Sequence, residues 1–199
     1  MRTLVIAEHD NQNVAPATLS TIKAAQALNQ EVDLLVACSS DTVLENAVKI
    51  EGISKVLAFK EDKFSNEIAE DIADCVIEVA ADYNYFLASS STTGKNNLPR
   101  FAALLDIQQI SEVIEIIDNS TFKKPIYAGA CIATVKTHQD KNILSIRTTA
   151  FEKVSAESGN AEIVSMSTPS SASKKARFLR NELTAVSYTH LTLPTILRV

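Results

Sequence analysis

The sequence predicts an α/β fold: a doubly wound, mostly parallel sheet of the nucleotide-binding-like, Rossmann type, with an antiparallel β extension. Over the first hundred residues, short and continuously apolar runs alternate with stretches whose apolar residues recur at helical spacing. Strands separated by helices pair in parallel through right-handed crossovers. After Leu105, strand-like segments follow one another over connections too short for helices, which indicates antiparallel pairing.

Four buried strands are predicted in the first half of the chain. They span residues 3–7, 32–37, 53–59 and 85–88, and the first is a short, continuously apolar run. Uninterrupted apolar runs of this length are typical of strands that are covered on both faces. We therefore expect these strands to lie in the interior of the sheet.

A helix is predicted after each of these strands. The first begins at Pro16, and the second has Asp41 as its N-cap and ends at Gly52. Ser65 is the expected N-cap of the third, with Glu67 near the positive end of its dipole. The fourth follows a polar turn. Apolar stripes support three of these helices: Leu19, Ile22, Ala25 and Leu28; Ile68, Ile72, Val76 and Val79; and Leu98, Phe101, Ala102 and Leu105.

The second half predicts the antiparallel extension. Residues 111–117, 126–135 and 143–149 are strand-like, and the last two are expected to form a hairpin across a tight loop. In this pairing Ile132, Thr134 and Lys136 face Ile143, Ser145 and Arg147.

Composition divides the chain into three parts. Residues 1–151 form the predicted α/β domain, and residues 152–180 are rich in serine, as linkers are. A short strand is possible within that linker, at residues 161–166. Residues 181–199 resemble neither of the preceding parts.

Charge and glycine content exclude several classes of function. The net charge is −5 and no basic cluster stands out, so nucleic acid and anionic membranes are disfavoured as partners. Only four glycines occur in 199 residues, and no G-x-G-x-x-G or Walker A motif can be written. No signal peptide and no membrane span are predicted. The cysteines are few and far apart, which predicts buried, structural thiols in a reducing compartment: Cys38, Cys75 and Cys131.

The polar turn after the fourth strand is the best candidate for a binding site. Ligands of open α/β sheets lie at the carboxyl ends of strands, and helix N-termini favour anions. The turn offers hydroxyls, backbone amides and one cation for a phosphate: Ser91, Thr92, Gly94, Lys95 and Asn96. It lacks the leading glycine of a P-loop, so a capped loop that only packs against its neighbours is the alternative.

Polar residues also follow the first strand. Glu8, His9 and Asp10 could supply a base or a ligand, but the three histidines of the chain are isolated and give no metal spacing. Ordinary loop polarity is the better interpretation. Because no G-x-S-x-G elbow and no activated cysteine is evident, the sequence predicts no catalytic constellation and no enzyme.

Four segments in order resemble the electron transfer flavoprotein alpha subunit. They read LVIAEHDN (4–11), ASSSTTGKNNLPRFAALLD (88–106), IYAGACIATVKT (126–137) and LSIRTTAF (144–151). The resemblance covers residues 1 to about 184. It implies an N-terminal α/β domain that has lost its nucleotide and packs against the beta subunit, which carries AMP.

The same resemblance places FAD outside this chain. In the family, a second alpha-subunit domain after the linker holds FAD, and electrons pass from acyl-CoA and related dehydrogenases to a membrane quinone oxidoreductase. We therefore expect a fragment that holds no cofactor alone, in the bacterial cytoplasm. Residues 181–199 are expected to be the stub of the FAD domain, and SYTHLTLPT in it resembles a translated sequencing adaptor, foreign from about Val186. A natural, divergent C-terminus is the alternative.

Overall fold

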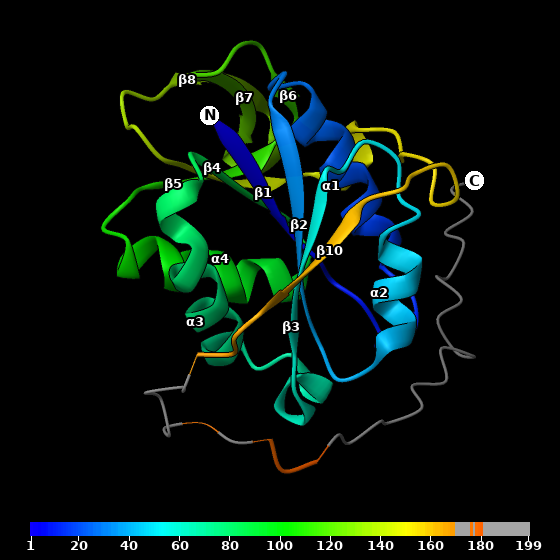
Figure 1. The fold of residues 1–199 in the computed structure, drawn as a ribbon. Coiled ribbons are helices and arrows are strands. Elements are labelled where there is room, and N and C mark those ends of the chain that lie inside the picture. Colours follow the sequence, from blue (N-terminus) through cyan, green and yellow to red (C-terminus); the bar gives the residue numbers. More distant parts are fainter. Residues whose placement is uncertain (170–175, 177, 181–199) are drawn as a thin grey trace, which may run out of the picture.

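Seven strands form a central sheet in which every neighbouring pair is parallel (Figure 1). The computed structural model describes residues 1–169, 176 and 178–180. Across the sheet the order is β10 (Glu162–Met166), β3 (Lys55–Lys60), β2 (Glu31–Cys38), β1 (Arg2–Ile6), β4 (Tyr85–Ser89), β9 (Asn142–Ile146) and β5 (Gln109–Val113). The four predicted strands of the first half are thus the inner strands β1 to β4.

Helices cover both faces of this sheet, as the doubly wound prediction requires. Figure 1 shows α1 (Pro16–Gln26) and α2 (Asp41–Ala47) on one side, and α3 (Ala69–Val79) and α4 (Thr92–Leu104) on the other. Each side has its own apolar core. Ile22 of α1 and Val43 of α2 are fully buried in one, while Val76 of α3 and Phe101 of α4 are fully buried in the other. Short 3-10 turns complete the fold: η1 (Asp62–Asn66), η2 (Ala80–Asp82), η3 (Tyr127–Gly129) and η4 (Thr148–Ala150).

The antiparallel extension exists as a separate sheet, but the predicted hairpin partners are wrong. The sheet consists of β6 (Glu115–Ile116), β7 (Thr121–Ile126) and β8 (Cys131–Lys136), and β7 pairs with β8. The strand that we expected to pair with residues 126–135 is β9, which instead lies between β4 and β5. Every residue of β9 is buried, as in a strand covered on both faces, so it could not have formed an exposed hairpin.

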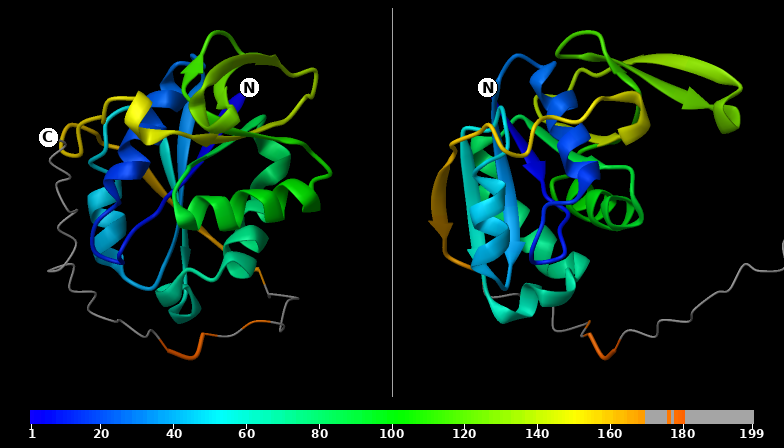
Figure 2. Two further views of the ribbon diagram at one scale, coloured as in Figure 1. Left: turned by 180° about the vertical axis from the view of Figure 1, so that it is seen from behind. Right: turned by 90° about the vertical axis from the view of Figure 1, so that its right-hand side faces the viewer.

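The three-stranded sheet, residues 115–136, projects from the body of the domain as an arm (Figure 2, right). β8 alternates between exposed and half-buried residues, so only one of its faces is covered. Cys131, at the start of β8, is exposed, which corrects the expectation of a buried thiol; Cys38 and Cys75 are buried as predicted.

Two predicted helix starts are also wrong. The hydroxyl of Ser40, rather than Asp41, caps α2 by accepting from the amide of Thr42 at 3.2 Å. Ser65 lies inside η1 and caps no helix. Glu67 follows η1 with a left-handed φ of 46°, and α3 begins only at Ala69. This turn holds the Glu67 side chain away from the helix and at the site described below.

Part of the predicted linker joins the domain. The possible strand at residues 161–166 is confirmed as β10, which adds to the sheet edge by parallel pairing with β3. The segment before it is tied to the end of α2 by backbone hydrogen bonds, including that from the Gly159 amide to the Lys49 carbonyl at 2.7 Å. A Cβ at Gly159 would lie 2.0 Å from the carbonyl oxygen of Ile50, so this approach requires glycine. The predictions for residues 181–199 fall outside the described residues.

Candidate functional site

The candidate site lies where β1 and β4 end side by side. β1 connects through α1 to β2 on one side of the sheet, while β4 leads through α4 toward the strands on the other. A parallel sheet opens a crevice at such a reversal, and ligands of open α/β proteins bind there. Glu8 lies shortly after the end of β1. Ser89 is the last residue of β4, and Ser91 directly precedes α4.

The carboxylate of Glu8 occupies this crevice. Its Oε1 accepts hydrogen bonds from the hydroxyl of Ser89 and from that of Ser91, the latter at 2.6 Å. Ser91 is also the N-cap of α4, because its Oγ accepts from the amide of Gly94 at 2.9 Å. Helix N-termini favour a negative group through their free amides and dipole. Here the chain itself supplies that group.

Gly94 makes this arrangement possible. A Cβ at Gly94 would lie 1.9 Å from the carbonyl oxygen of Ser89 and 3.5 Å from Oε1 of Glu8. The first of these distances is a clash with backbone, which cannot move aside as a side chain can. The glycine therefore lets α4 approach the end of β4 closely enough for Ser91 to reach Glu8.

The other residues of the predicted phosphate turn do not converge on the crevice. The ammonium group of Lys95 pairs with Oε1 of Glu112 at 2.6 Å, and Arg147 contacts the other oxygen of the same carboxylate at 3.3 Å. Thr92 and Asn96 are exposed. Thus Ser91 and Gly94 are brought together with Glu8, while Lys95 is engaged elsewhere and Thr92 and Asn96 face solvent.

His9 is buried and neutral. Its Nε2 lies 3.0 Å from the carbonyl oxygen of Ala37, which can only accept, so Nε2 carries the hydrogen. Its Nδ1 accepts from the amide of Asn11 at 3.2 Å, which fixes the tautomer. Burial lowers the pKa of His9, in agreement with an uncharged ring.

Glu67 is the member of this cluster that the sequence analysis misplaced. Its Oε1 accepts from the backbone amide of His9 at 3.2 Å. Burial, followed by the nearby charge of Glu8, raises the pKa of Glu67 to about 7, against the hydrogen bond from His9, which lowers it. From the sequence we expected Glu67 in the first turn of a helix. In the structure Glu67 has a left-handed backbone conformation, and its side chain is directed to His9.

Glu8, His9 and Asp10 therefore do three different things. Asp10 lies at the surface, where the amides of Gln12 and Asn13 donate to its carboxylate at 2.9 and 2.6 Å and lower its pKa. No group of three potential metal-ligating side chains occurs in the part of the chain that the structure describes. Glu8 is thus an internal anion, and ordinary loop polarity stays the prediction for these three residues.

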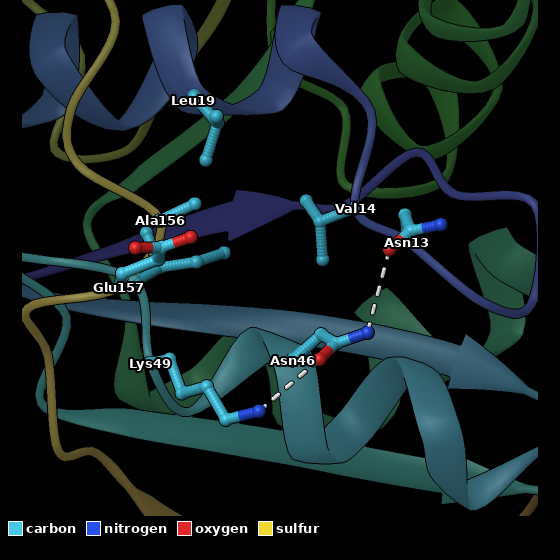
Figure 3. Close-up of a pocket in the computed structure, with 8 residues that line it drawn as sticks. Asn13, Val14, Leu19, Asn46, Lys49, Ala156 and Glu157 are labelled. Carbon is cyan, nitrogen blue, oxygen red and sulfur yellow. Dashed lines mark hydrogen bonds between the residues drawn. The ribbon is translucent and has the colours of Figure 1, made fainter.

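A cavity of about 220 Å³ lies between α1, α2 and the segment before β10 (Figure 3). Asn46 spans its floor: its amide nitrogen lies 3.4 Å from Oδ1 of Asn13 and its oxygen accepts from Lys49 at 3.3 Å. In Figure 3 the polar groups of Asn13, Asn46 and Lys49 are thus joined to one another, and the cavity lies where three packed segments meet.

Comparison with known proteins decides the family. The family model described as "Electron transfer flavoprotein domain" matches residues 3–171. The chain belongs to this family. The curated relatives that it matches include the electron transfer flavoprotein subunit alpha of Pseudomonas aeruginosa, which is 43% identical over 197 residues, with 98% of this chain and 63% of the relative covered.

More distant relatives carry the same name. The mitochondrial electron transfer flavoprotein subunit alpha of Dictyostelium discoideum is 37% identical over 81% of this chain and 48% of its own length. That of Paracoccus denitrificans is 37% identical over 74% of this chain and 47% of its own length. The chain thus spans about half to two-thirds of the electron transfer flavoprotein subunits that it matches.

The extent of the alignment bears on the C-terminal segment of the chain. The alignment with the Pseudomonas protein covers 98% of the chain and so extends into residues 186–199, whose foreign origin stays a prediction. Within the described residues, we find no helix with the length and apolar character that a membrane crossing requires.

Replacement of Ser91 by alanine should destabilise the domain by about 2 kcal/mol. The change removes both an N-cap and a hydrogen bond to a carboxylate, which contribute about 1 and about 1.5–3 kcal/mol respectively in other proteins, and the two losses overlap. Ser40→Ala is the matched control, because Ser40 caps α2 and its hydroxyl has no carboxylate partner among the described residues. Urea unfolding of both variants checks this; equal losses would show that the contact with Glu8 contributes nothing.

Proposed function

We propose that this chain is the subunit-packing domain of an electron transfer flavoprotein alpha subunit and holds no cofactor alone. The observation that carries this proposal is Glu8 in the crevice between β1 and β4. A nucleotide or flavin phosphate does not fit there, because it would meet the carboxylate at the N-terminus of α4. The domain therefore contributes structure and contact surface, and the redox chemistry belongs to other parts of the protein.

The rest of the proposal concerns the complete protein. The relatives are named flavoproteins and are longer than this chain. We propose that FAD binds in the part of the subunit that this chain does not span, which makes the chain a fragment. Electrons from acyl-CoA and related dehydrogenases pass through that FAD to a membrane quinone oxidoreductase, and the complete protein works in the bacterial cytoplasm.

The beta subunit is proposed to contact the arm formed by residues 115–136. Apolar side chains are exposed at its outer end, where β7 turns into β8: Tyr127 is 81% exposed and Ile132 54%. Large exposed apolar groups that lie together are typical of protein interfaces. These exposed side chains support a contact on β7 and β8.

Ile132→Thr should weaken binding of the cognate beta subunit about tenfold. Loss of an apolar anchor in the centre of an interface typically costs more than about 1 kcal/mol. Ile163→Thr is the control, since Ile163 is 44% exposed on β10, at the far edge of the central sheet from β5. Titration calorimetry of both variants tests the proposal. Failure of the unchanged chain to bind, or equal weakening by the two substitutions, contradicts it.

A free-standing phosphate-binding module is the alternative. It would use the turn from Ser91 to Asn96, and the N-terminus of α4 at the strand reversal favours it. Against it stand the carboxylate of Glu8 in the crevice and the ion pair of Lys95 with Glu112. Calorimetry with AMP and ATP decides: heat that disappears in Lys95→Ala would favour this alternative over the subunit proposal.

A further inference from the structure

A pocket of about 230 Å³ lies at the carboxyl edge of the central sheet, between the loop after β1 and the end of η1. We call it the edge pocket. Residues 9–11 of the loop and residues 65–67 at the end of η1 line it, together with Phe178. Phe178 comes from the segment after β10, which is remote in sequence from the other two. A distant part of the chain thus supplies one wall of the pocket.

β10 brings the chain to this edge of the sheet. It pairs in parallel with β3, and its last residue, Met166, lies opposite Phe59 near the end of β3. η1 follows β3 at the same edge. There the ammonium group of Lys63 donates to the carbonyl oxygen of Pro169 at 3.1 Å. The segment after β10 is therefore attached to η1 soon after the strand ends.

Lys63 is held in place by its own neighbours in and beside η1. Its Nζ lies 3.6 Å from Oε2 of Glu61 and 5.1 Å from the centre of the Phe64 ring, which is completely buried. Ordering of a long side chain normally opposes a contact of this kind, because rotamer freedom is lost. Here that freedom is already restricted, so the bond to Pro169 costs little further entropy.

Phe178 is the second point of attachment. It is 41% exposed, whereas the adjacent Leu179 is 74% exposed, so more than half of Phe178 is covered by its surroundings. Figures 1 and 2 show residues 178–180 in orange, close to η1 at the end of β3. An aromatic ring covers a large apolar area with few rotatable bonds, which suits it as an anchor.

Polar groups that join the two sides of the edge pocket are already paired. Nδ2 of Asn11 donates to the carbonyl oxygen of Ser65 at 3.3 Å, and Oδ1 of Asn11 accepts from the amide of Ser39 at 3.0 Å. Glu67 accepts from the amide of His9 at 3.2 Å. An apolar ring that covers hydrogen-bonded groups avoids the cost of leaving polar groups unpaired. The pocket can therefore receive an aromatic ring although most of its lining is polar.

We infer that the edge pocket is an intramolecular docking site, in which Phe178 anchors the segment after β10. The bond from Lys63 to Pro169 shortens the loop that docking must close, and so lowers its entropic cost. In the sheet order β10-β3-β2-β1, β10 is outermost, and the loop that lines the pocket follows β1. Docking of Phe178 thus returns the chain from the outer edge of the sheet toward the crevice that contains Glu8. The inference is independent of the proposed function, since it involves neither flavin nor the beta subunit.

Amide NMR spectra of Phe178→Ala and Leu179→Ala in the isotopically labelled 199-residue chain test the docking. An aromatic ring shifts the resonances of the groups that it covers, so Phe178→Ala should change the amide shifts at residues 9–11 and 65–67. Leu179→Ala, the matched control, removes the more exposed neighbouring side chain and should leave those shifts unchanged. Absence of the changes in Phe178→Ala, or equal changes in both variants, would overturn the inference.

A fluorescence measurement gives the degree to which the anchor is covered. The chain has no tryptophan, so Phe178→Trp and Leu179→Trp each contain a single indole. Acrylamide should quench the indole of Phe178→Trp about half as strongly as that of Leu179→Trp, in proportion to the exposed fractions of 41% and 74%. Quenching of equal strength would mean that both side chains lie in water, and it would also overturn the inference.

Discussion

Asp33→Ala is expected to lower the free energy of unfolding by about 3 kcal/mol. The Asp33 side chain is completely buried in β2, and its Oδ2 accepts from Nη2 of Arg2 at 2.5 Å and from the hydroxyl of Tyr83 at 2.6 Å. Removal of one member of a buried charged group typically costs about 3–5 kcal/mol, because the partner charge is left uncompensated. We expect the lower end, since the Arg2 side chain is 32% exposed and keeps access to water.

Tyr83→Phe is the control for Asp33. It removes one hydrogen bond and leaves the ion pair between Arg2 and Asp33, so it should cost about 1 kcal/mol. Denaturant unfolding at pH 7 measures both variants. If Asp33→Ala were no more harmful than Tyr83→Phe, the group would be held together by packing and its charge would be unimportant.

Asp33 also illustrates what the sequence could and could not predict about the fold. The run at residues 32–37 is apolar enough to identify a strand covered on both faces, and β2 is such a strand. Nothing in that run indicates that its one acidic residue is buried, because the partners Arg2 and Tyr83 lie on other strands or loops. Local periodicity predicts elements, whereas the compensation of a buried charge depends on tertiary contacts.

The mistaken hairpin has a similar cause. The run of β9 is as apolar as an inner strand, but it follows the antiparallel β8 closely in sequence, which made local pairing the simpler prediction. Burial on both faces decides the matter: β9 inserts between β4 and β5, and β8 pairs with β7 instead. A short connection therefore did not mean a hairpin.

The sequence predicts where the candidate site lies, but it does not predict which side chains contact one another there. Parallel strands bring their carboxyl ends to one edge, so the polar residues after β1 and β4 had to lie close together. Which of them would fill the crevice depended on the side chains: Glu8 accepts from Ser89 and Ser91, and Lys95 turns to Glu112. Glu67 could not be included, since its left-handed backbone conformation leaves no mark in the sequence.

Glu67→Gln is expected to stabilise the domain at pH 8 by about 3 kcal/mol and to have little effect near pH 4. In the folded protein the pKa of Glu67 is raised from 4.5 to about 7, so the folded state binds the proton more tightly than the unfolded state does. This contribution to stability is fully present below pH 4.5 and is lost as the pH rises through 7, at about 1.4 kcal/mol for each pH unit. Glutamine stays neutral throughout and can still accept from the amide of His9.

The surroundings of Glu67 explain why its ionised form is disfavoured. Its side chain is 21% exposed, and Oε1 lies 3.5 Å from Nδ1 of His9, an atom that itself accepts from Asn11. A negative oxygen thus faces another acceptor and the charge of Glu8. His9 acts in the opposite direction: burial lowers its pKa in the folded protein, so its contribution to stability is present above pH 6.5 and is lost as the pH falls below 6.5 toward the lowered pKa.

Unfolding free energies at a series of pH values between 4 and 8 separate the two groups. The difference between wild type and Glu67→Gln isolates Glu67, because His9 is present in both proteins. Glu78→Gln is the control, since Glu78 is exposed on α3 and its replacement should change stability by less than about 0.5 kcal/mol at any pH. A difference between wild type and Glu67→Gln that stayed constant with pH would mean that Glu67 has an ordinary pKa in the folded domain. The turn at residues 66–68 would then hold its carboxylate in water, and the buried contact with His9 would not exist in solution.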